Sequence, residues 1–183
     1  MNLIPKPTVL ITGASTGIGA ACAIELDRRG WHVFAGVRRE EDAKALQDKA
    51  SERLTPVMLD VTIPEQITQA IQTIETTVGD QGLNGLVNNA GIAIGGPLEA
   101  VSDELLRKQL DVNVFGAIAV TRTAMPLLRR GQGRIVMMGS ISGRIAVPFL
   151  SPYAMSKFAL EALSDSLRNE VYRWGLRVSL VEP

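Results

Sequence analysis

The sequence is poor in several features that mark common classes of protein. It has one cysteine, Cys22, among 183 residues, so no disulfide can form within the chain and a reducing compartment is expected. Its 19 Lys and Arg balance 19 Asp and Glu, so no net charge attracts nucleic acid or an anionic membrane. It also lacks the long apolar run of a membrane span and the N-terminal apolar stretch of a secretory signal. These absences predict a soluble, cytoplasmic protein with no nucleic-acid partner and no membrane span.

Residue types that bind metals are scarce as well. The single histidine, His32, begins an expected strand and has no second ligand type close to it in the sequence, so no metal site is expected. The composition is otherwise ordinary: 46% of the residues are hydrophobic and 21% are charged, which suits a globular protein with a buried core. No internal repeat, low-complexity tract or linker divides the chain, so residues 1–183 are expected to form a single domain.

Short β-forming runs alternate with stretches of helical periodicity. Apolar residues recur at three- and four-residue steps over residues 64–78, which is typical of an amphipathic helix. A longer helix is expected over residues 151–174, with Ser151 as its N-cap and Pro152 as its first helical residue. The alternation predicts an α/β, Rossmann-like doubly wound parallel sheet of about six strands, in the order 3-2-1-4-5-6, with helices on both faces. The expected strands are Thr8–Thr12, His32–Val37, Pro56–Val61, Gly85–Asn88, Arg134–Met138 and Arg177–Val181.

A glycine-rich segment follows the first expected strand. The residues TGASTGIG, at positions 12–19, open a helix that continues to about Arg29. A diphosphate can approach backbone amides and the positive end of a helix where glycines carry no side chain. The spacing G-x3-G-x-G differs from the dinucleotide pattern G-x-G-x-x-G, although the strand, turn and helix context is the same. A tight turn between strand and helix is the alternative. The residues expected to contact a dinucleotide here are Gly13, Ser15, Thr16, Gly17, Ile18 and Gly19.

The end of the second expected strand bears on the choice between NADP and NAD. An acidic residue about 20 residues past the glycine loop normally holds the ribose 2′-hydroxyl. This chain has Arg38 and Arg39 there instead. An arginine can bind a 2′-phosphate through charge-assisted hydrogen bonds that an unphosphorylated ribose cannot match. We therefore expect Arg38, with Arg39 beside it, to favour NADP(H), while NAD(H) stays possible; the alternative is two solvated arginines at the start of a helix.

A tyrosine and a lysine lie one helical turn apart. Tyr153 and Lys157 are four residues apart near the start of the last long helix, which puts both side chains on one face. A nearby ammonium favours an ionised phenol, so the pair could transfer a proton near neutral pH. Ser140 follows an expected strand at the sheet edge where open α/β folds bind ligands, and its hydroxyl could hold a substrate oxygen. Asn113 lies in an apolar run and needs hydrogen-bond partners, so a bound water or a backbone kink is expected there.

Taken together, these motifs resemble the short-chain dehydrogenase/reductase family. The resemblance implies that Tyr153 is the general acid/base and that Lys157 assists it and binds the nicotinamide ribose. It also implies that Ser140 positions the carbonyl and that Asn113 holds a proton-relay water. Asp60 and Val61 would lie at the adenine, and the NNAG segment, Asn88, Asn89, Ala90 and Gly91, would form a strand end that stabilises the sheet and lines the adenine ribose. The matching segments, in order along nearly the whole chain, are TGASTGIG at 12–19, Asp60 with Val61, NNAG at 88–91, Asn113, Ser140 and YAMSK at 153–157.

Within that family, the segments at 37–39 and 138–171 are most similar to the retinol and steroid dehydrogenase-like branch. This resemblance implies an NADP-dependent oxidoreductase that interconverts an alcohol and its carbonyl, on an apolar substrate. The apolar residues 92–94 and 145–150 follow strands that end at the expected site, so they predict an apolar pocket, with ordinary packing as the alternative. The family's long helices also suggest a homodimer or homotetramer.

The resemblance has a gap at the end of the chain. The sequence stops at Glu182 and Pro183, whereas the family continues with a glycine, a substrate-covering segment and a further strand. We therefore expect a domain that is incomplete at its C-terminus, with strand 177–181 as an open edge. A catalytically silent nucleotide-binding or assembly module is a second reading. A sugar-nucleotide epimerase or dehydratase can share the Tyr-x3-Lys pair, but the glycine spacing and the compact length argue against it.

Overall fold

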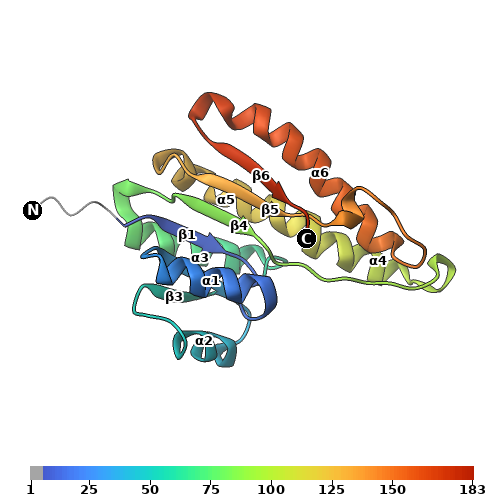
Figure 1. Ribbon diagram of the computed structural model, residues 1–183, viewed down its shortest axis with the longest axis horizontal. Coiled ribbons are helices and arrows are strands. Elements are labelled where there is room, and N and C mark those ends of the chain that lie inside the picture. Colours follow the sequence, from blue (N-terminus) through green and yellow to red (C-terminus); the bar gives the residue numbers. More distant parts are fainter. Residues whose placement is uncertain (1–5) are drawn as a thin grey trace, which may run out of the picture.

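The computed structural model describes residues 6–183, and a parallel six-stranded sheet runs through them (Figure 1). The strand order is β3-β2-β1-β4-β5-β6, which confirms the doubly wound topology expected from the alternation of strands and helices. The order reverses between β1 and β4, and in such sheets this point, at the carboxyl ends of the strands, is where ligands bind. The strands are β1 (Thr8–Ile11), β2 (His32–Val37), β3 (Leu54–Met58), β4 (Gly85–Asn88), β5 (Arg134–Met138) and β6 (Arg177–Val181).

Helices pack against the sheet in two layers. Helices α3, α5 and α6 lie on one face, over a large core that includes Leu10, Phe34, Leu86 and Ile135. Helices α1 and α2 lie on the other face, over a smaller core around β1, β2 and β3 (Figure 1). Within the part of the chain that the structure describes, no helix has the length and apolar character needed to cross a membrane. The helices are α1 (Gly17–Arg28), α2 (Glu40–Gln47), α3 (Pro64–Val78), α4 (Asp103–Leu110), α5 (Gly116–Arg130) and α6 (Ser151–Val171).

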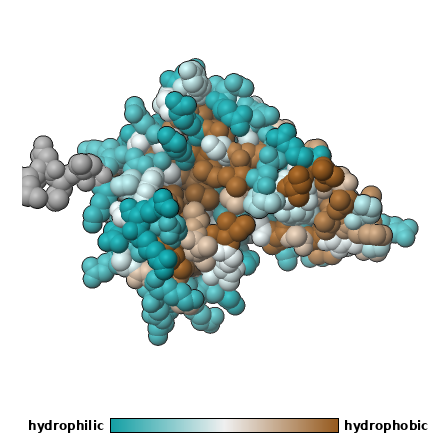
Figure 2. All heavy atoms as spheres, viewed as in Figure 1, coloured by the Kyte–Doolittle hydropathy of each residue, from teal (hydrophilic) through white to brown (hydrophobic). Residues whose placement is uncertain are grey.

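The α1 side of the sheet is less covered over its second half. Strands β5 and β6 have no helix of residues 6–183 packed on the side of the sheet where α1 and α2 lie. In Figure 2, apolar side chains gather near the middle of this face, where β4, β5 and β6 pass. Strand β6 is the last strand in this order among residues 6–183, and Val181 is 44% exposed.

Several boundaries differ from the sequence expectations, and β1 ends at Ile11, one residue before the expected Thr12. Strand β3 pairs with β2 from Val33 opposite Leu54 to Val37 opposite Met58, so it lies earlier than the expected Pro56–Val61. The expected N-cap role of Ser151 is wrong: Ser151 is itself helical, because the amide of Ala154 donates to the carbonyl of Leu150 and starts α6 one residue sooner. Pro152 therefore stands second in the helix, and α6 passes into a 3-10 turn, Tyr172–Trp174, before ending at Gly175.

Candidate active site

The glycine loop after β1 brings the backbone close to its neighbours. Gly13 has φ +63°, and a Cβ there would lie 2.8 Å from the Cα of Ala90. A Cβ at Gly19 would overlap the carbonyl oxygen of Gly13 and the side-chain amide of Asn89. At Gly17, with φ +58°, a Cβ would instead meet nothing within 4 Å, so this position faces open space. Gly13 and Gly19 thus allow tight packing, and Gly17 leaves room beside the start of α1.

A set of hydrogen bonds joins this loop to the segment after β4. The Thr12 hydroxyl accepts from the amides of Asn89 and Ala90, at 3.0 Å each. The Asn89 side-chain amide donates to the carbonyls of Thr12 and Gly13, at 3.0 and 2.9 Å. Because both carbonyls and both amides are hydrogen-bonded, the glycine loop after β1 and the segment after β4 hold each other rigidly. Together they form a rim at the point where the strand order reverses.

The N-terminus of α1 is suited to a phosphate group. Thr16 precedes the helix with extended backbone and makes no side-chain capping bond, and residues 17–20 include no acidic side chain. The first amides of a helix are therefore free to donate, and the helix dipole favours an anion there. A dinucleotide diphosphate fits this donor set together with the open space at Gly17.

A cavity of about 850 Å³ runs along this rim from the end of β2 to the segment after β4. Its size is that of a site for a cofactor-sized molecule. It collects most of the residues expected to bind the dinucleotide. Ten of them line it: Gly13, Ser15, Thr16, Ile18, Arg38, Asp60, Val61, Asn89, Ala90 and Gly91.

The two arginines after β2 have different surroundings. Arg39 donates from Nε and a terminal nitrogen to both carboxylate oxygens of Asp42, at 2.9 Å each, and so is held in a bidentate ion pair. Arg38 lines the large cavity, whereas Arg39 does not. The geometry therefore separates the two arginines: of the two, Arg38 faces the cofactor cavity.

Four charged residues of the large cavity were not anticipated from the sequence. They come from α4 and the turn after it. Nothing local in the sequence shows that α4 contributes to this cavity. These residues are Glu104, Arg107, Lys108 and Asp111.

A second cavity of about 280 Å³ holds the expected catalytic residues. Ser140, Tyr153 and Lys157 all line it, although they come from the turn after β5 and from the first two turns of α6. The two cavities share Ile18, Asn89, Gly91 and Ile92 among their lining residues, so the smaller one continues the larger. A dinucleotide lying along the rim would therefore end beside the hydroxyl groups.

Lys157 is buried and fixed. Its Nζ donates to the carbonyl oxygen of Met138 at 2.6 Å and lies 5.5 Å from the centre of the Tyr153 ring. Only 7% of the residue is exposed. Burial disfavours the charged amine and lowers the pKa of Lys157 to about 8. The ammonium therefore lies beside the phenol, in a setting where its charge can be lost near physiological pH.

Asn113 lies one layer behind the catalytic cavity. It is 1% exposed and sits in a π-type turn, Asp111–Phe115, that joins α4 to α5, in agreement with the expected backbone kink. Its Oδ1 accepts from the amide of Ile92 at 2.8 Å, and its Nδ2 donates to the Ile92 carbonyl and to the Ser156 hydroxyl, at 3.0 Å each. Ser156 in turn donates to the carbonyl of Tyr153 at 2.7 Å. Asn113 thus connects the loop after β4 to the catalytic helix.

Gln109 performs a matching role that the sequence did not reveal. It lies one turn before Asn113 and is fully buried. Its Oε1 accepts from the amide of Ile94 at 2.7 Å, and its Nε2 donates to the carbonyl of Ile92 at 2.8 Å. The two amides together hold the extended loop after β4 in the way that a neighbouring strand would. Their i, i+4 spacing was a signal, but their target lies 15 or more residues away.

Asn88, which the family resemblance placed at the cofactor, points elsewhere. Its side chain is buried and donates to the Thr121 hydroxyl at 2.8 Å and to the Met137 sulfur at 3.3 Å. It does not line either of the two cavities. In this structure Asn88 ties β4 to α5 and β5, and its neighbours Asn89, Ala90 and Gly91 reach the cofactor cavity.

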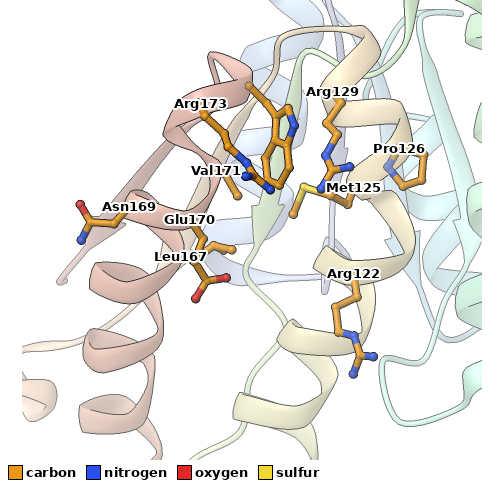
Figure 3. A pocket seen from close by; sticks show the side chains of 10 residues that line it. Arg122, Met125, Pro126, Arg129, Leu167, Asn169, Glu170, Val171 and Arg173 are labelled. Atoms are coloured by element: carbon orange, nitrogen blue, oxygen red, sulfur yellow. The ribbon is translucent and has the colours of Figure 1, made fainter.

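A third hollow lies between α5 and the end of α6, away from the catalytic residues (Figure 3). The indole ring of Trp174 lies between two guanidinium groups, with Arg129 at 3.6 Å and Arg173 at 4.3 Å from the ring centre. Arg122 and Glu170 add charge around an apolar floor that includes Met125. None of the expected catalytic or cofactor residues lines this hollow.

Comparisons with known proteins agree with this arrangement. The chain matches the family model described as short chain dehydrogenase over residues 7–183. It is 44% identical to mouse retinol dehydrogenase 16 and 47% identical to bovine 17-beta-hydroxysteroid dehydrogenase type 6, in each case over 96% of this chain and 55% of the relative. The chain therefore spans about half the length of these curated relatives.

Solved structures show the same fold. A short-chain dehydrogenase from Streptomyces avermitilis superposes with a TM-score of 0.92 at 33% identity, over 99% of this chain and 66% of that one. A structure described as ElxO with NADP bound gives a TM-score of 0.91 at 30% identity, over 98% of this chain and 73% of that one. With a family match across residues 7–183, the glycine rim and the Ser140, Tyr153 and Lys157 cavity, the chain belongs to the short-chain dehydrogenase family.

Proposed function

We propose that this chain is the dinucleotide-binding and catalytic part of an NADP-dependent oxidoreductase that interconverts an alcohol and its carbonyl. The observation that carries the proposal is the continuity of the two cavities, since the large one ends where Ser140, Tyr153 and Lys157 meet. We propose that residues 1–183 act as one domain. A bound nicotinamide would supply the hydride in reduction and accept it in oxidation.

The residues of the small cavity account for the movement of the proton. In reduction, the Tyr153 hydroxyl donates its proton to the substrate oxygen, and in oxidation the phenolate takes that proton back. The Lys157 ammonium, fixed by the Met138 carbonyl, favours the phenolate through its charge. The Ser140 hydroxyl is placed to hold the same substrate oxygen by a hydrogen bond. Asn113 holds Ile92 and Ser156 in place, and we propose that it also orders a water that carries the proton onward.

We propose an apolar alcohol or ketone as the substrate. Two similar proteins are named for retinol and a hydroxysteroid. In this chain the loop that follows Ser140 exposes Ile145, Val147 and Phe149, which are 58%, 46% and 65% exposed. The loop after β4 runs beside it, because the amide of Gly96 donates to the carbonyl of Phe149 at 2.7 Å. An apolar substrate would gain from contact with these side chains.

NADPH oxidation with a panel of apolar ketones and aldehydes tests the proposal, and NADPH binding is followed separately by fluorescence. Consumption that needs both the carbonyl and NADPH would support it. Binding without turnover of any carbonyl would instead favour the second function, a catalytically silent nucleotide-binding or assembly module. Tightly retained NAD with sugar-nucleotide turnover would favour an epimerase or dehydratase.

Arg38 is proposed to select NADP over NAD. Replacing Arg38 by Asp should weaken NADPH binding by about 30-fold more than NADH binding, because a charge-assisted hydrogen bond to the 2′-phosphate is worth about 2 kcal/mol. Dissociation constants for both cofactors, measured by fluorescence, check this. Arg39→Asp is the matched control, since Arg39 is held by Asp42 and should change the preference far less. An equal loss for NADPH and NADH in Arg38→Asp would remove the 2′-phosphate contact.

The low pKa of Lys157 has a consequence for stability. The pKa falls from 10.5 to about 8 on folding, so between these pH values the unfolded chain binds more protons than the folded one. Stability from this group therefore rises with pH across that window and is lowest below pH 8. We expect the stability of Lys157→Met relative to wild type to fall by about 2 kcal/mol between pH 7 and pH 10. Urea unfolding at both pH values measures it, and an unchanged difference would mean that Lys157 titrates normally.

Self-association and location are proposed on the family resemblance. The hollow between α5 and α6 offers apolar surface with both charge signs, which suits contact with a second copy of this chain (Figure 3). Light scattering on the purified chain decides between monomer and homodimer or homotetramer. The cytoplasmic location stays a prediction that cell fractionation tests.

A further inference from the structure

A cluster of three charged residues lies behind the catalytic cavity. Arg144 follows the 3-10 turn Ile141–Gly143, which begins at Ser140. Its guanidinium donates to Glu182 Oε1 at 2.8 Å and pairs with Glu161 Oε2 at 3.0 Å. The three residues belong to the turn after β5, to α6 and to the segment after β6. One arginine thus bridges three parts of the fold.

Each of these parts carries a residue of the catalytic cavity. The turn carries Ser140, α6 carries Tyr153 and Lys157, and the segment after β6 carries Pro183. Glu161 lies one turn after Lys157, on the same side of α6. The Arg144 cluster therefore connects three parts of the chain that line the catalytic cavity, at a point outside the cavity itself.

Close backbone contacts support the same junction. The amide of Ile141 donates to the carbonyl of Pro183 at 3.3 Å. Gly143 approaches α6 so closely that a Cβ there would lie 3.0 Å from Glu161 Oε1 and 3.1 Å from the Lys157 carbonyl oxygen. The turn is therefore seated directly on α6, and the ion cluster closes its outer side.

Burial of the Glu161 carboxylate lowers the stability of the folded chain. Its side chain is 13% exposed, and among residues 6–183 no group donates a hydrogen bond to its Oε1. Burial raises the pKa of Glu161, the Arg144 charge opposes this, and the Glu182 charge adds to it. The ion pair offsets little of this cost, because the Arg144 side chain is 61% exposed and an exposed ion pair adds little to stability. Its presence beside the site therefore suggests that it fixes geometry.

We propose that Arg144, Glu161 and Glu182 form a positioning cluster that sets the Ser140 turn against Tyr153 and Lys157. The three residues do not touch the substrate; they act through the turn and the end of β6. The inference rests on the proposed oxidoreductase function. Displacement of a reacting group by about 1 Å can slow an enzyme by about 100-fold, so a loosened turn should reduce turnover without loss of cofactor binding.

Kinetics on the full chain form the first test. Arg144→Met should lower kcat for carbonyl reduction by about 10- to 100-fold, because the Ser140 turn would no longer be held against Tyr153 and Lys157. The NADPH dissociation constant should change less than twofold. Arg144→Lys keeps the charge and should restore part of kcat. Arg168→Met is the matched control: Arg168 also joins α6 to β6, through the Val178 carbonyl at 3.1 Å, but does not touch the Ser140 turn, so kcat should stay within about threefold.

A double-mutant comparison shows whether the residues act as a unit. Adding Glu182→Gln to Arg144→Met should cost little more than Arg144→Met alone, because the contact between the two is already lost. If the loss of kcat in the double variant equals the product of the losses in the two single variants, the residues act independently and the proposal is wrong. An unchanged kcat in folded Arg144→Met would also contradict it. If Arg144→Met does not fold, the milder Arg144→Lys and Glu182→Gln variants decide by the same measures.

Hydrogen exchange provides a second test that needs no turnover. In Arg144→Met, the amides of residues 141–145 should exchange at least tenfold faster than in wild type, while in Arg168→Met they should not change. Absence of turnover in wild type would refute the proposed function, and the exchange result would still decide the positioning role. Unchanged exchange in the Ser140 turn would overturn the cluster even in an active enzyme.

Discussion

Tyr153→Phe is expected to reduce carbonyl turnover by about 1,000-fold, since a positioned general acid contributes on the order of 10²–10⁴ in rate. Phenylalanine keeps the ring that packs against Lys157 and removes only the hydroxyl that would donate the proton. NADPH affinity should therefore change less than threefold, because the cavity proposed to hold the dinucleotide keeps its shape. Steady-state oxidation of NADPH with a saturating ketone, beside fluorescence titration of NADPH, measures both quantities.

The chain offers a matched control for this substitution. Its only other tyrosine, Tyr172, lies in the 3-10 turn after α6 and is 74% exposed. Tyr172→Phe removes the same atom from a place that faces solvent, so kcat should stay unchanged. If Tyr153→Phe kept most of its activity, the proton would have to come from another group, and the proposed chemistry would be wrong.

Gly17→Ala is expected to weaken NADPH binding by about 100-fold. The Cβ of alanine would enter the open space at the start of α1, where the diphosphate is proposed to lie, and would keep it away from the helix amides. The same alanine must adopt φ +58°, which costs roughly 1–2 kcal/mol of stability. Fluorescence titration gives the affinity, and urea unfolding gives the stability.

Gly30→Ala separates the loss of NADPH affinity from the loss of stability. Gly30 also has a positive φ, +87°, and open space at its Cβ position, but it lies past the far end of α1, away from the glycine loop and the first amides of the helix. Its alanine variant should lose a similar amount of stability and bind NADPH normally. Equal NADPH affinity in the Gly17 and Gly30 variants would place the diphosphate somewhere other than this loop.

The sequence was informative wherever a structural requirement is local. The alternation of apolar strands with helices such as α3 predicted the parallel sheet, and the Rossmann-like fold that it indicated supplied the strand order, which the structure confirms. The positive φ angles of Gly13 and Gly17 follow from the same short segment that signalled a dinucleotide loop. The spacing of Tyr153 and Lys157 needed only the geometry of one helix.

Boundaries and caps were less accessible. The start of β3 depends on which residues of β2 it pairs with, and the start of α6 depends on a hydrogen bond to Leu150 that competes with the capping tendency of Ser151. In both places a contact outside the local pattern decides the conformation.

Several residues of the site could not be found in this way. The amide of Gln109 is satisfied by Ile92 and Ile94, and Asn88 turns away to Thr121 and Met137. Arg144 meets Glu182 across 38 residues of chain. Such pairs leave no periodic pattern in the sequence. Each member satisfies a hydrogen-bonding or charge requirement that exists only once distant elements have packed together.

The sequence by itself determined the elements of this protein, the doubly wound sheet and the identity of the residue types at its switch point. It could do so because helical and strand periods and glycine conformations are set within a few residues. Only the tertiary structure decided which of those residues share a cavity, which lie behind it, and how Arg144 joins three parts of the chain that line the catalytic cavity. The physical reason is that burial and electrostatic pairing depend on the three-dimensional neighbours of a side chain, and these are brought together by the packing of the whole sheet with its helices.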